Sequence, residues 1–292
     1  MKAIRTEKLT KFYGEARGII DVDLSVDRGE FFGFIGPNGA GKSTTIRTLL
    51  GLITATSGEA EIFGLNVNKD RQKILSMIGY LPSEAMFYNE MRVAELLDFS
   101  AKLRGVDCRD EAKRLCDRLE LDVTRRVREL SLGNRKKVGI VSALQHRPEL
   151  YILDEPTSGL DPLMQREFYS ILTERCKEGA TVFLSSHILS EVGRYCERAA
   201  VIREGKILVT DTIDRLGHTG VKRVSLRGVG ALPEIANIRD VKREADTLTF
   251  LYDGGAEALV SELSKLRFDD LTISDPDFEE VFMHYYAKGE EK

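Results

Sequence analysis

Tryptophan is absent from this 292-residue chain, and cysteine and proline are scarce, with four and seven residues. No two cysteines have the C-x-x-C or Cys/His spacing of a zinc site or a redox pair. We therefore expect reduced thiols, as is usual in a reducing compartment. A low proline content with 42% apolar residues is typical of a packed globular protein and excludes a fibrous or disordered chain. The cysteines are Cys108, Cys116, Cys176 and Cys196.

Long apolar segments are missing as well. No stretch approaches the roughly 20 consecutive apolar residues that cross a bilayer, and the richest runs are as short as Phe31 to Ile35. The first eight residues interleave charged and apolar side chains, so we expect no secretory signal. If the function involves a membrane, another subunit has to cross it, and we expect this chain to be cytoplasmic.

Neither sign of charge dominates the chain. The 43 Lys and Arg residues stand against 47 Asp and Glu residues, which gives a formal net charge of -4. Proteins that bind DNA or RNA usually carry a clear excess of basic residues. We therefore expect no nucleic-acid partner.

A glycine-rich segment separates a predicted strand from a predicted helix. Phe31 to Ile35 is apolar on both faces, as in the centre of a sheet. Apolar residues at helical spacing begin after about Lys42. The residues between them, Gly36-Pro37-Asn38-Gly39-Ala40-Gly41-Lys42-Ser43, match the phosphate-binding pattern G-x-x-x-x-G-K-[ST].

Such a loop directs backbone N–H groups at phosphate oxygens beside a helix N-terminus. We predict that Lys42 neutralises the β- and γ-phosphates of ATP and that Ser43 is a ligand of Mg²⁺. The residues expected to contact the nucleotide here are Gly36, Asn38, Gly39, Ala40, Gly41, Lys42, Ser43 and Thr44.

Two further apolar runs end in polar side chains. Leu150 to Leu153 is followed by Asp154 and Glu155, and Thr181 to Leu184 is followed shortly by His187. Ligands of parallel sheets bind beyond the carboxyl ends of the strands. We predict that Asp154 holds Mg²⁺ through water, that Glu155 is the general base for the attacking water, and that His187 contacts the γ-phosphate.

In this order the motifs resemble those of ABC-family nucleotide-binding domains, over essentially residues 1 to 215. The resemblance implies that Tyr13 stacks on adenine and that His187 is the switch histidine. It also implies that Leu130-Ser131-Leu132-Gly133-Asn134 occupies the place of the LSGGQ signature. Ser158-Gly159-Leu160-Asp161 fits the loop that crosses between subunits, so Asp161 is expected near the nucleotide.

In that family two domains dimerise head to tail, which implies that Ser131 and Gly133 of one chain cover the ATP of the other. Leu132 and Asn134 depart from the signature. Ser83 stands where the family usually has a glutamine that reaches Mg²⁺. Either a water bridges from Ser83, or the neighbouring glutamate substitutes, or coupling at this point is looser.

The pattern changes near residues 216 to 220, which predicts a nucleotide-binding domain over 1–216, with a helical subdomain at about 84–145, and an accessory domain over 217–292. The predicted elements are a strand near Val224, a helix from Leu232, a hairpin with arms at Val241 and Leu248 to Tyr252, a helix over Ala256 to Leu266 and a strand at Leu271, which give the order βαββαβ, and a last helix from Asp275 follows. This order suggests a small ferredoxin-like domain. It resembles the accessory domain of bacterial exporter-type ATPases, with a dimer-stabilising or regulatory role or a purely structural one.

The predicted fold class is α/β. It is a P-loop NTPase core of the ABC type, with a mixed sheet, an antiparallel β subdomain and a helical subdomain, plus a small α+β ferredoxin-like domain. We expect an ATPase that uses ATP and Mg²⁺ to power a membrane exporter. Its expected partners are a separately encoded polytopic permease and a second ATPase subunit, most simply a copy of itself, on the inner face of the cell membrane.

Two other functions stay open. The departures at Leu132 and Ser83 favour a weakly active or regulatory subunit that pairs with a homologue. A soluble ABC ATPase acting on DNA or ribosomes is the other class, although such relatives carry long coiled-coil insertions or two ATPase units, and this chain has neither.

Overall fold

The computed structural model describes residues 1–84, 86–217, 221–230 and 235–276. The chain divides into two compact units, Met1–Asp211 and Thr212–Lys292. Each unit has its own hydrophobic core. We describe them separately.

An antiparallel sheet forms one part of the first unit. Its strand order is β2-β1-β5-β6, and β3 also pairs with β1. The long strand β1 buries Ile4 and Leu9 while its charged side chains face solvent, so the sheet covers the core with one face. The strands are β1 (Lys2–Tyr13), β2 (Ala16–Val22), β3 (Ser25–Asp27), β5 (Ser57–Ile62) and β6 (Leu65–Asn66).

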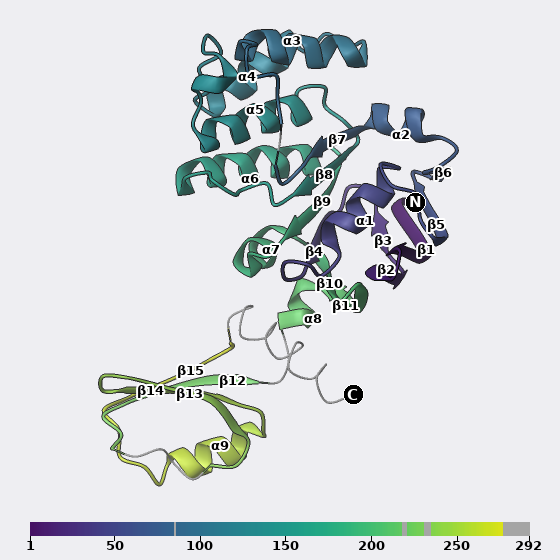
Figure 1. Ribbon diagram of the computed structural model, residues 1–292. Helices are drawn as coiled ribbons and strands as arrows, with labels where there is room; N and C mark the ends of the chain where they lie inside the picture. Colours follow the sequence, from purple (N-terminus) through teal and green to yellow (C-terminus); the bar gives the residue numbers. More distant parts are fainter. Residues whose placement is uncertain (85, 218–220, 231–234, 277–292) are drawn as a thin grey trace. The chain divides into compact units, whose positions relative to one another are not determined.

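A second sheet crosses the centre of this unit in the order β11-β10-β4-β9-β8-β7, and the strands from β10 to β7 run parallel (Figure 1). Every residue of β4, β8 and β9 is buried, which explains their unbroken apolar runs and confirms the strands predicted there. The strands are β4 (Phe31–Ile35), β7 (Ile78–Leu81), β8 (Leu150–Asp154), β9 (Thr181–Ser186), β10 (Arg198–Arg203) and β11 (Lys206–Thr212).

Helices cover this parallel sheet. Helix α1 packs on β8, α6 on β9, and α7 on β4 and β9. Pro162 starts α6 at a position where its missing N–H costs nothing. The helices are α1 (Lys42–Leu49), α2 (Arg71–Met77), α6 (Pro162–Lys177) and α7 (Leu189–Tyr195).

A helical layer follows β7 in sequence and lies at one end of the unit in Figure 1. The apolar stripes of its helices are buried, including Val93, Leu96, Leu97 and Leu115. Gly105 ends the first helix in a left-handed conformation, with φ of 67°. The elements are α3 (Val93–Arg104), α4 (Arg109–Arg118), a short 3₁₀ helix (Val127–Glu129) and α5 (Leu132–Leu144), all inside the range predicted to be helical.

The second unit begins with α8 and contains an antiparallel sheet in the order β13-β14-β12-β15. Helix α9 packs its apolar side chains into a core around Phe250. The predicted helices from Leu232 and Asp275 lie almost wholly outside the described residues, so the ferredoxin-like assignment stays a prediction. The elements are α8 (Ile213–Gly217), β12 (Lys222–Arg227), β13 (Ile238–Glu244), β14 (Thr247–Tyr252), α9 (Ala256–Leu263) and β15 (Asp270–Ser274).

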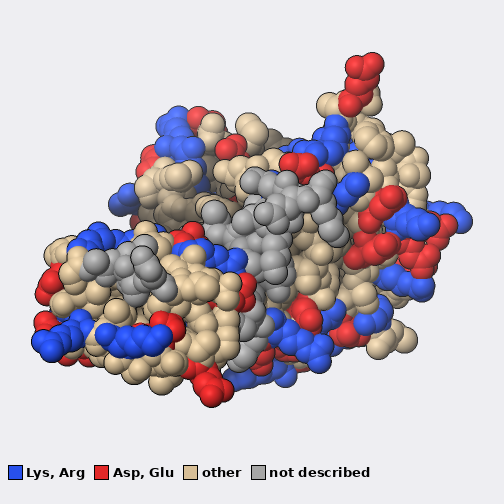
Figure 2. Space-filling view, turned by 90° about the horizontal axis from the view of Figure 1, so that it is seen from below, with Lys and Arg blue, Asp and Glu red and all other residues tan. Residues whose placement is uncertain are grey.

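Charged side chains of both signs are mixed on the surface that Figure 2 shows. Many charged side chains of the described residues are paired, as Lys2 is with Asp27 at 2.9 Å and Arg17 with Glu204 at 3.1 Å. In the part of the chain that the structure describes, no helix has the length and apolar character needed to span a bilayer.

Candidate functional site

The glycine-rich loop lies between β4 and α1, at the carboxyl end of the parallel sheet. Gly41, immediately before α1, has a φ of 110°, which side chains with a Cβ rarely adopt. A Cβ on Gly36 would lie only 2.5 Å from the carbonyl oxygen of Ile202. No side chain caps the start of α1. Backbone geometry therefore requires glycine here, and the first turn of α1 is available to an anion.

Lys42 is held inside this loop. Its side chain is 6% exposed, and Nζ donates hydrogen bonds to the carbonyl oxygens of Gly36 at 2.6 Å and Pro37 at 3.2 Å. The same Nζ lies 3.2 Å from Oε1 of Glu155. The buried ammonium is thus paired with a carboxylate, as a charge at such depth requires. A phosphate that enters the loop would replace Glu155 as its counter-ion.

Asp154 ends β8 as a buried carboxylate, 2% exposed. The Ser43 hydroxyl donates to Oδ2 of Asp154 at 2.8 Å, and the Ser185 hydroxyl donates to Oδ1 at 2.9 Å. A hydroxyl and a carboxylate this close are the hard oxygen ligands that Mg²⁺ prefers. The described residues contain no group of three or more His, Cys, Asp or Glu that could hold a metal. An ion here would take its other ligands from phosphates and water.

Glu155 bridges Lys42 and His187. Its Oε2 lies 2.6 Å from Nδ1 of His187, and its side chain is 15% exposed against 49% for the histidine. The backbone of Glu155 has a φ of 49°, a left-handed value that is strained for a residue with a Cβ. Its N–H nevertheless donates to the Ser185 carbonyl at 3.0 Å, which fixes the strained residue at the strand end. Strain of this kind concentrates at functional sites.

Lys42, Ser43 and Glu155 border a pocket of about 270 Å³, whereas their partners Asp154 and His187 do not line it. Its wall includes nine of the residues predicted to form the site: Tyr13, Asn38, Gly39, Gly41, Lys42, Ser43, Thr44, Ser83 and Glu155.

Three residues of this wall are not predicted from the sequence: Arg17, Gly18 and Pro37. A Cβ on Gly18 would lie 3.1 Å from the Tyr13 ring and 2.6 Å from the Lys11 carbonyl oxygen, so only glycine leaves room for the ring. Arg17 pairs with Phe12 across the β1–β2 hairpin. The short turn after Tyr13 is the signal that places Arg17 and Gly18 beside the predicted aromatic, and Pro37 belongs to the predicted phosphate-binding loop.

Other predicted residues lie outside this pocket. Gly36 and Ala40 belong to the loop but do not line the pocket. Ser131 caps α5, accepting a hydrogen bond from the Asn134 N–H at 3.3 Å. Asp161 caps α6, accepting from two backbone N–H groups at 3.0 Å. Within one chain, Ser131 and Asp161 therefore act as helix caps and are not gathered at the pocket.

The signature-like segment packs on the loop 158–161 of the same chain. A Cβ on Gly133 would lie 2.6 Å from the carbonyl oxygen of Gly159, so the two backbones touch. Leu132, which departs from the signature, is 75% exposed and points away from the core. Both segments that the resemblance assigns to a subunit interface thus form one surface.

Ser83 is fixed in position by a buried lysine that sequence patterns do not reveal. Lys136 of α5 is 5% exposed, and its Nζ donates to the carbonyl oxygens of Ser83 at 3.0 Å and Pro82 at 3.4 Å. Burial lowers the pKa of Lys136 to about 8, and the negative charges of Asp154 and Glu155 oppose only part of this shift. The loop that carries Ser83 is therefore attached to the helix that begins at the signature-like segment.

A family model described as "ABC transporter" matches residues 19–158. The chain is 34% identical to the bacitracin transport ATP-binding protein BcrA of Bacillus licheniformis, over 98% of each chain. It is 29% identical to the linearmycin resistance ATP-binding protein LnrL of Bacillus subtilis (strain 168), over 96% of this chain and 97% of that protein. The dimeric structure of a bacterial ABC transporter cassette covers 72% of this chain and 98% of its own, with a TM-score of 0.64 and 25% identity.

The glycine loop beside a buried acidic strand end defines a nucleotide-binding P-loop protein. With the similarity to BcrA along nearly its whole length, the chain belongs to the ABC transporter family, and it is an ATP-binding subunit of such a transporter. The predicted fold class of the core and the predicted family are confirmed.

Proposed function

We propose that this chain hydrolyses ATP with Mg²⁺ and that two copies of it power a membrane exporter. The observation that carries the proposal is the row of paired groups at the carboxyl ends of the central strands. Ser43 contacts Asp154, and Lys42 contacts Glu155, which in turn contacts His187. A metal-ligand pair thus lies next to a phosphate-binding cation and a carboxylate with a histidine partner.

Each of these groups has a role in phosphoryl transfer to water. Lys42 and the loop N–H groups bind the phosphates and stabilise the charge that builds on them. Ser43 and Asp154 would hold Mg²⁺, which when bound neutralises phosphate charge, and Ser83 would reach it through water. Glu155, released from Lys42 by the incoming phosphate, accepts a proton from the attacking water. His187 remains beside Glu155 and contacts the departing γ-phosphate.

A second chain completes the site. The pocket of about 270 Å³ is below the range of roughly 300–1,000 Å³ usual for sites that enclose a ligand. The surface formed by Ser131, Gly133 and the loop through Asp161 does not line the pocket of its own chain, and it would cover the ATP of the partner. The dimeric arrangement of the similar bacterial cassette supports a homodimer.

Export is supported by the relatives. BcrA is named for bacitracin transport and LnrL for linearmycin resistance. By this analogy the partner is a separately encoded polytopic permease, and the chain works at the cytoplasmic face of the membrane. ATP performs work on the permease only because it binds the closed dimer better than the open pair. The accessory domain, residues 217–292, would stabilise or regulate this dimer.

The test is the variant Glu155→Gln, which keeps the shape of the side chain and removes the base. With Mg·ATP, the purified variant should bind nucleotide, turn over at most about a thousandth as fast as the wild type, and form a stable dimer. Light scattering reports the dimer. A variant that stays monomeric at saturating ATP would refute the composite site.

Lys42→Ala is the matched control, since it removes phosphate binding and should give neither dimer nor hydrolysis. The same control separates the alternative of a weakly active subunit, which the exposed Leu132 and the short Ser83 favour. An active ATPase loses its turnover in Lys42→Ala, whereas a catalytically inert subunit has the same background rate in both proteins.

A further inference from the structure

The turn that carries His187 is closed by a serine side chain. The Ser186 hydroxyl, at the end of β9, accepts a hydrogen bond from the N–H of Ile188 at 3.0 Å. Serine hydroxyls commonly bind a backbone N–H two residues later in the chain. His187 is the residue between the two, so this hydrogen bond fixes the backbone from which its side chain extends.

The side chain of His187 has a weaker hold. It is 49% exposed, and its Nδ1 lies 2.6 Å from Oε2 of Glu155. In the mechanism proposed above, Glu155 leaves Lys42 and turns to the attacking water when ATP binds. The contact with Glu155 alone therefore does not keep the histidine in place through hydrolysis, and the backbone of the turn has to do so.

A second hydrogen bond orients the Ser186 hydroxyl. Ser186 is 1% exposed, and the hydroxyl donates to Oε2 of Glu191 at 3.2 Å. A hydroxyl has one proton and two lone pairs, so a proton directed at Glu191 leaves a lone pair for the Ile188 N–H. Without this acceptor the buried hydroxyl has to find another by changing its rotamer, which moves the oxygen away from Ile188.

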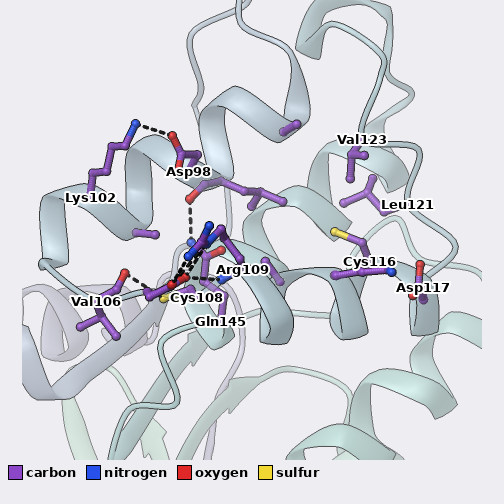
Figure 3. Close-up of a pocket in the computed structure, with 16 residues that line it drawn as sticks. Asp98, Lys102, Val106, Cys108, Arg109, Cys116, Asp117, Leu121, Val123 and Gln145 are labelled. Carbon is purple, nitrogen blue, oxygen red and sulfur yellow. Dashed lines mark hydrogen bonds and ion pairs between the residues drawn. The ribbon is translucent and has the colours of Figure 1, made fainter.

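Glu191 differs from the acidic residues of the surface. Asp98, for example, is exposed and lies 2.6 Å from the ammonium of Lys102 (Figure 3). Glu191 is 8% exposed, and its Oε2 accepts from a hydroxyl and not from a cation. Acidic residues are seldom buried in this way, because removing a carboxylate from water is costly. A buried acid that contacts the His187 turn is therefore better explained by function than by stability.

Helix α7 holds Glu191 against this turn. Glu191 lies in the first turn of α7, where the helix dipole favours a negative charge. The helix packs on β4 and β9, and Val192 is so close to β4 that a Cβ on Gly33 would overlap its side chain. Since β9 also carries Ser186, the same sheet positions both partners of the hydrogen bond.

We propose that Glu191 is a positioning residue for ATP hydrolysis. Through the Ser186 hydroxyl and the Ile188 N–H, it holds His187 beside Glu155 in the orientation that meets the γ-phosphate. The role of Glu191 rests on the proposed function, in which His187 contacts that phosphate. Glu191 does not line the nucleotide pocket and acts only through the turn.

The first experiment is a double-mutant cycle on ATPase turnover, measured above the Lys42→Ala background. Glu191→Met keeps the length of the side chain and removes the acceptor, so it should lower kcat about tenfold and change KM less than about threefold. His187→Ala should itself lower kcat at least about tenfold. In that background Glu191→Met should lower kcat less than about twofold further, because the residue that Glu191 positions is gone. Damage unrelated to His187 would have the same factor in both backgrounds.

Three further variants are matched to this cycle. Glu191→Gln keeps an oxygen that accepts from Ser186 and should retain kcat within about threefold. Ser190→Met places the same new side chain on the exposed neighbour in α7 and should leave kcat unchanged. Ser186→Ala removes both hydrogen bonds and should lower kcat as Glu191→Met does. If thermal unfolding shows that Glu191→Met is not folded, Ser186→Ala takes its place in the cycle.

The second measurement needs no ATPase activity. NMR follows hydrogen exchange of the Ile188 amide in the nucleotide-free protein. Exchange should be at least about tenfold faster in Glu191→Met and in Ser186→Ala, and close to the wild-type rate in Glu191→Gln and Ser190→Met.

The outcomes distinguish failure of this role from failure of the proposed function. If His187→Ala lowers kcat but Glu191→Met does not, or if Glu191→Met has one factor in both backgrounds, Glu191 does not position His187 and the proposed function stands. Wild-type turnover in His187→Ala overturns the assignment of His187 to the γ-phosphate, and the role of Glu191 with it. An unchanged Ile188 exchange rate in Glu191→Met overturns the role of Glu191 whatever the turnover.

Discussion

His146 should make the protein sensitive to mild acid. It lies two residues after the end of α5, and its Nε2 is 3.1 Å from the Ile78 carbonyl oxygen. Because that oxygen only accepts, Nε2 carries the proton in the neutral ring and Nδ1 is bare. Nδ1 is buried without a hydrogen-bond partner among the described residues. A second proton would therefore have no acceptor.

The size of the effect follows from the pKa. Burial, helped by the positive charge of Arg104, lowers the pKa of His146 from 6.5 to about 4. In the unfolded chain the ring takes up its proton near pH 6.5, so the folded state binds fewer protons between pH 6.5 and 4. Its contribution to stability is complete above pH 6.5 and is lost as pH falls to 4. The full shift would correspond to roughly 3 kcal/mol, and partial exposure reduces this to about 2 kcal/mol.

His146→Gln keeps a donor for the Ile78 carbonyl and removes the titration. We expect urea unfolding to show that the free energy of unfolding falls between pH 7 and pH 4 in both proteins. The decrease should be about 2 kcal/mol smaller for the variant than for the wild type. Carboxylates titrate in the same window, but they are common to both proteins and cancel in the difference.

An independent readout is the ring-proton NMR titration. The chain has four histidines, so the resonance missing from the variant identifies His146. Parallel unfolding profiles, or a His146 pKa above 6, would refute the reasoning.

Two further changes test the contacts around the signature-like segment. Gly133→Ala forces a Cβ against the Gly159 carbonyl oxygen, an overlap worth about 1–3 kcal/mol, so ATPase turnover should fall at least about tenfold while nucleotide binding by the single chain persists. Unchanged turnover would contradict this packing. Lys136→Met removes the donor to the Ser83 loop and should lower kcat about tenfold with a smaller change in KM, because charged hydrogen bonds contribute roughly 1.5–3 kcal/mol. Lys137→Met, its neighbour, is the control and should leave kcat near the wild-type value.

The central strands and the phosphate loop can be predicted from the sequence because local chemistry determines them. β4 and β8 are buried on both faces, so their apolar runs are unbroken, and Gly36 to Ser43 follows one of these strands directly. Strand β1 lacks such a signal. Its twelve residues alternate imperfectly between buried and exposed, and charged side chains occupy the exposed positions.

Residues whose role depends on distant segments are harder to predict. In the sequence, Lys136 does not differ from other basic residues on a helix. Only the fold brings its amine to the Ser83 carbonyl oxygen, 53 residues earlier in the chain. Gly18 is required because the Lys11 carbonyl and the Tyr13 ring lie against it. Asp161 is recognisable as a helix cap from the proline that follows it, which is a local signal.

Helix α5 connects three residues, one at each end of the helix and one within it. Its thirteen residues span about 20 Å, with Ser131 capping one end, Lys136 near that end and Gln145 at the other. A tilt of this rod as two chains close would move the Ser83 loop with it, because Lys136 attaches that loop to α5. Thermodynamic reciprocity then requires that a partner which binds the Ser83 loop in one position of α5 shifts the affinity for ATP by the same factor by which ATP shifts the affinity for that partner.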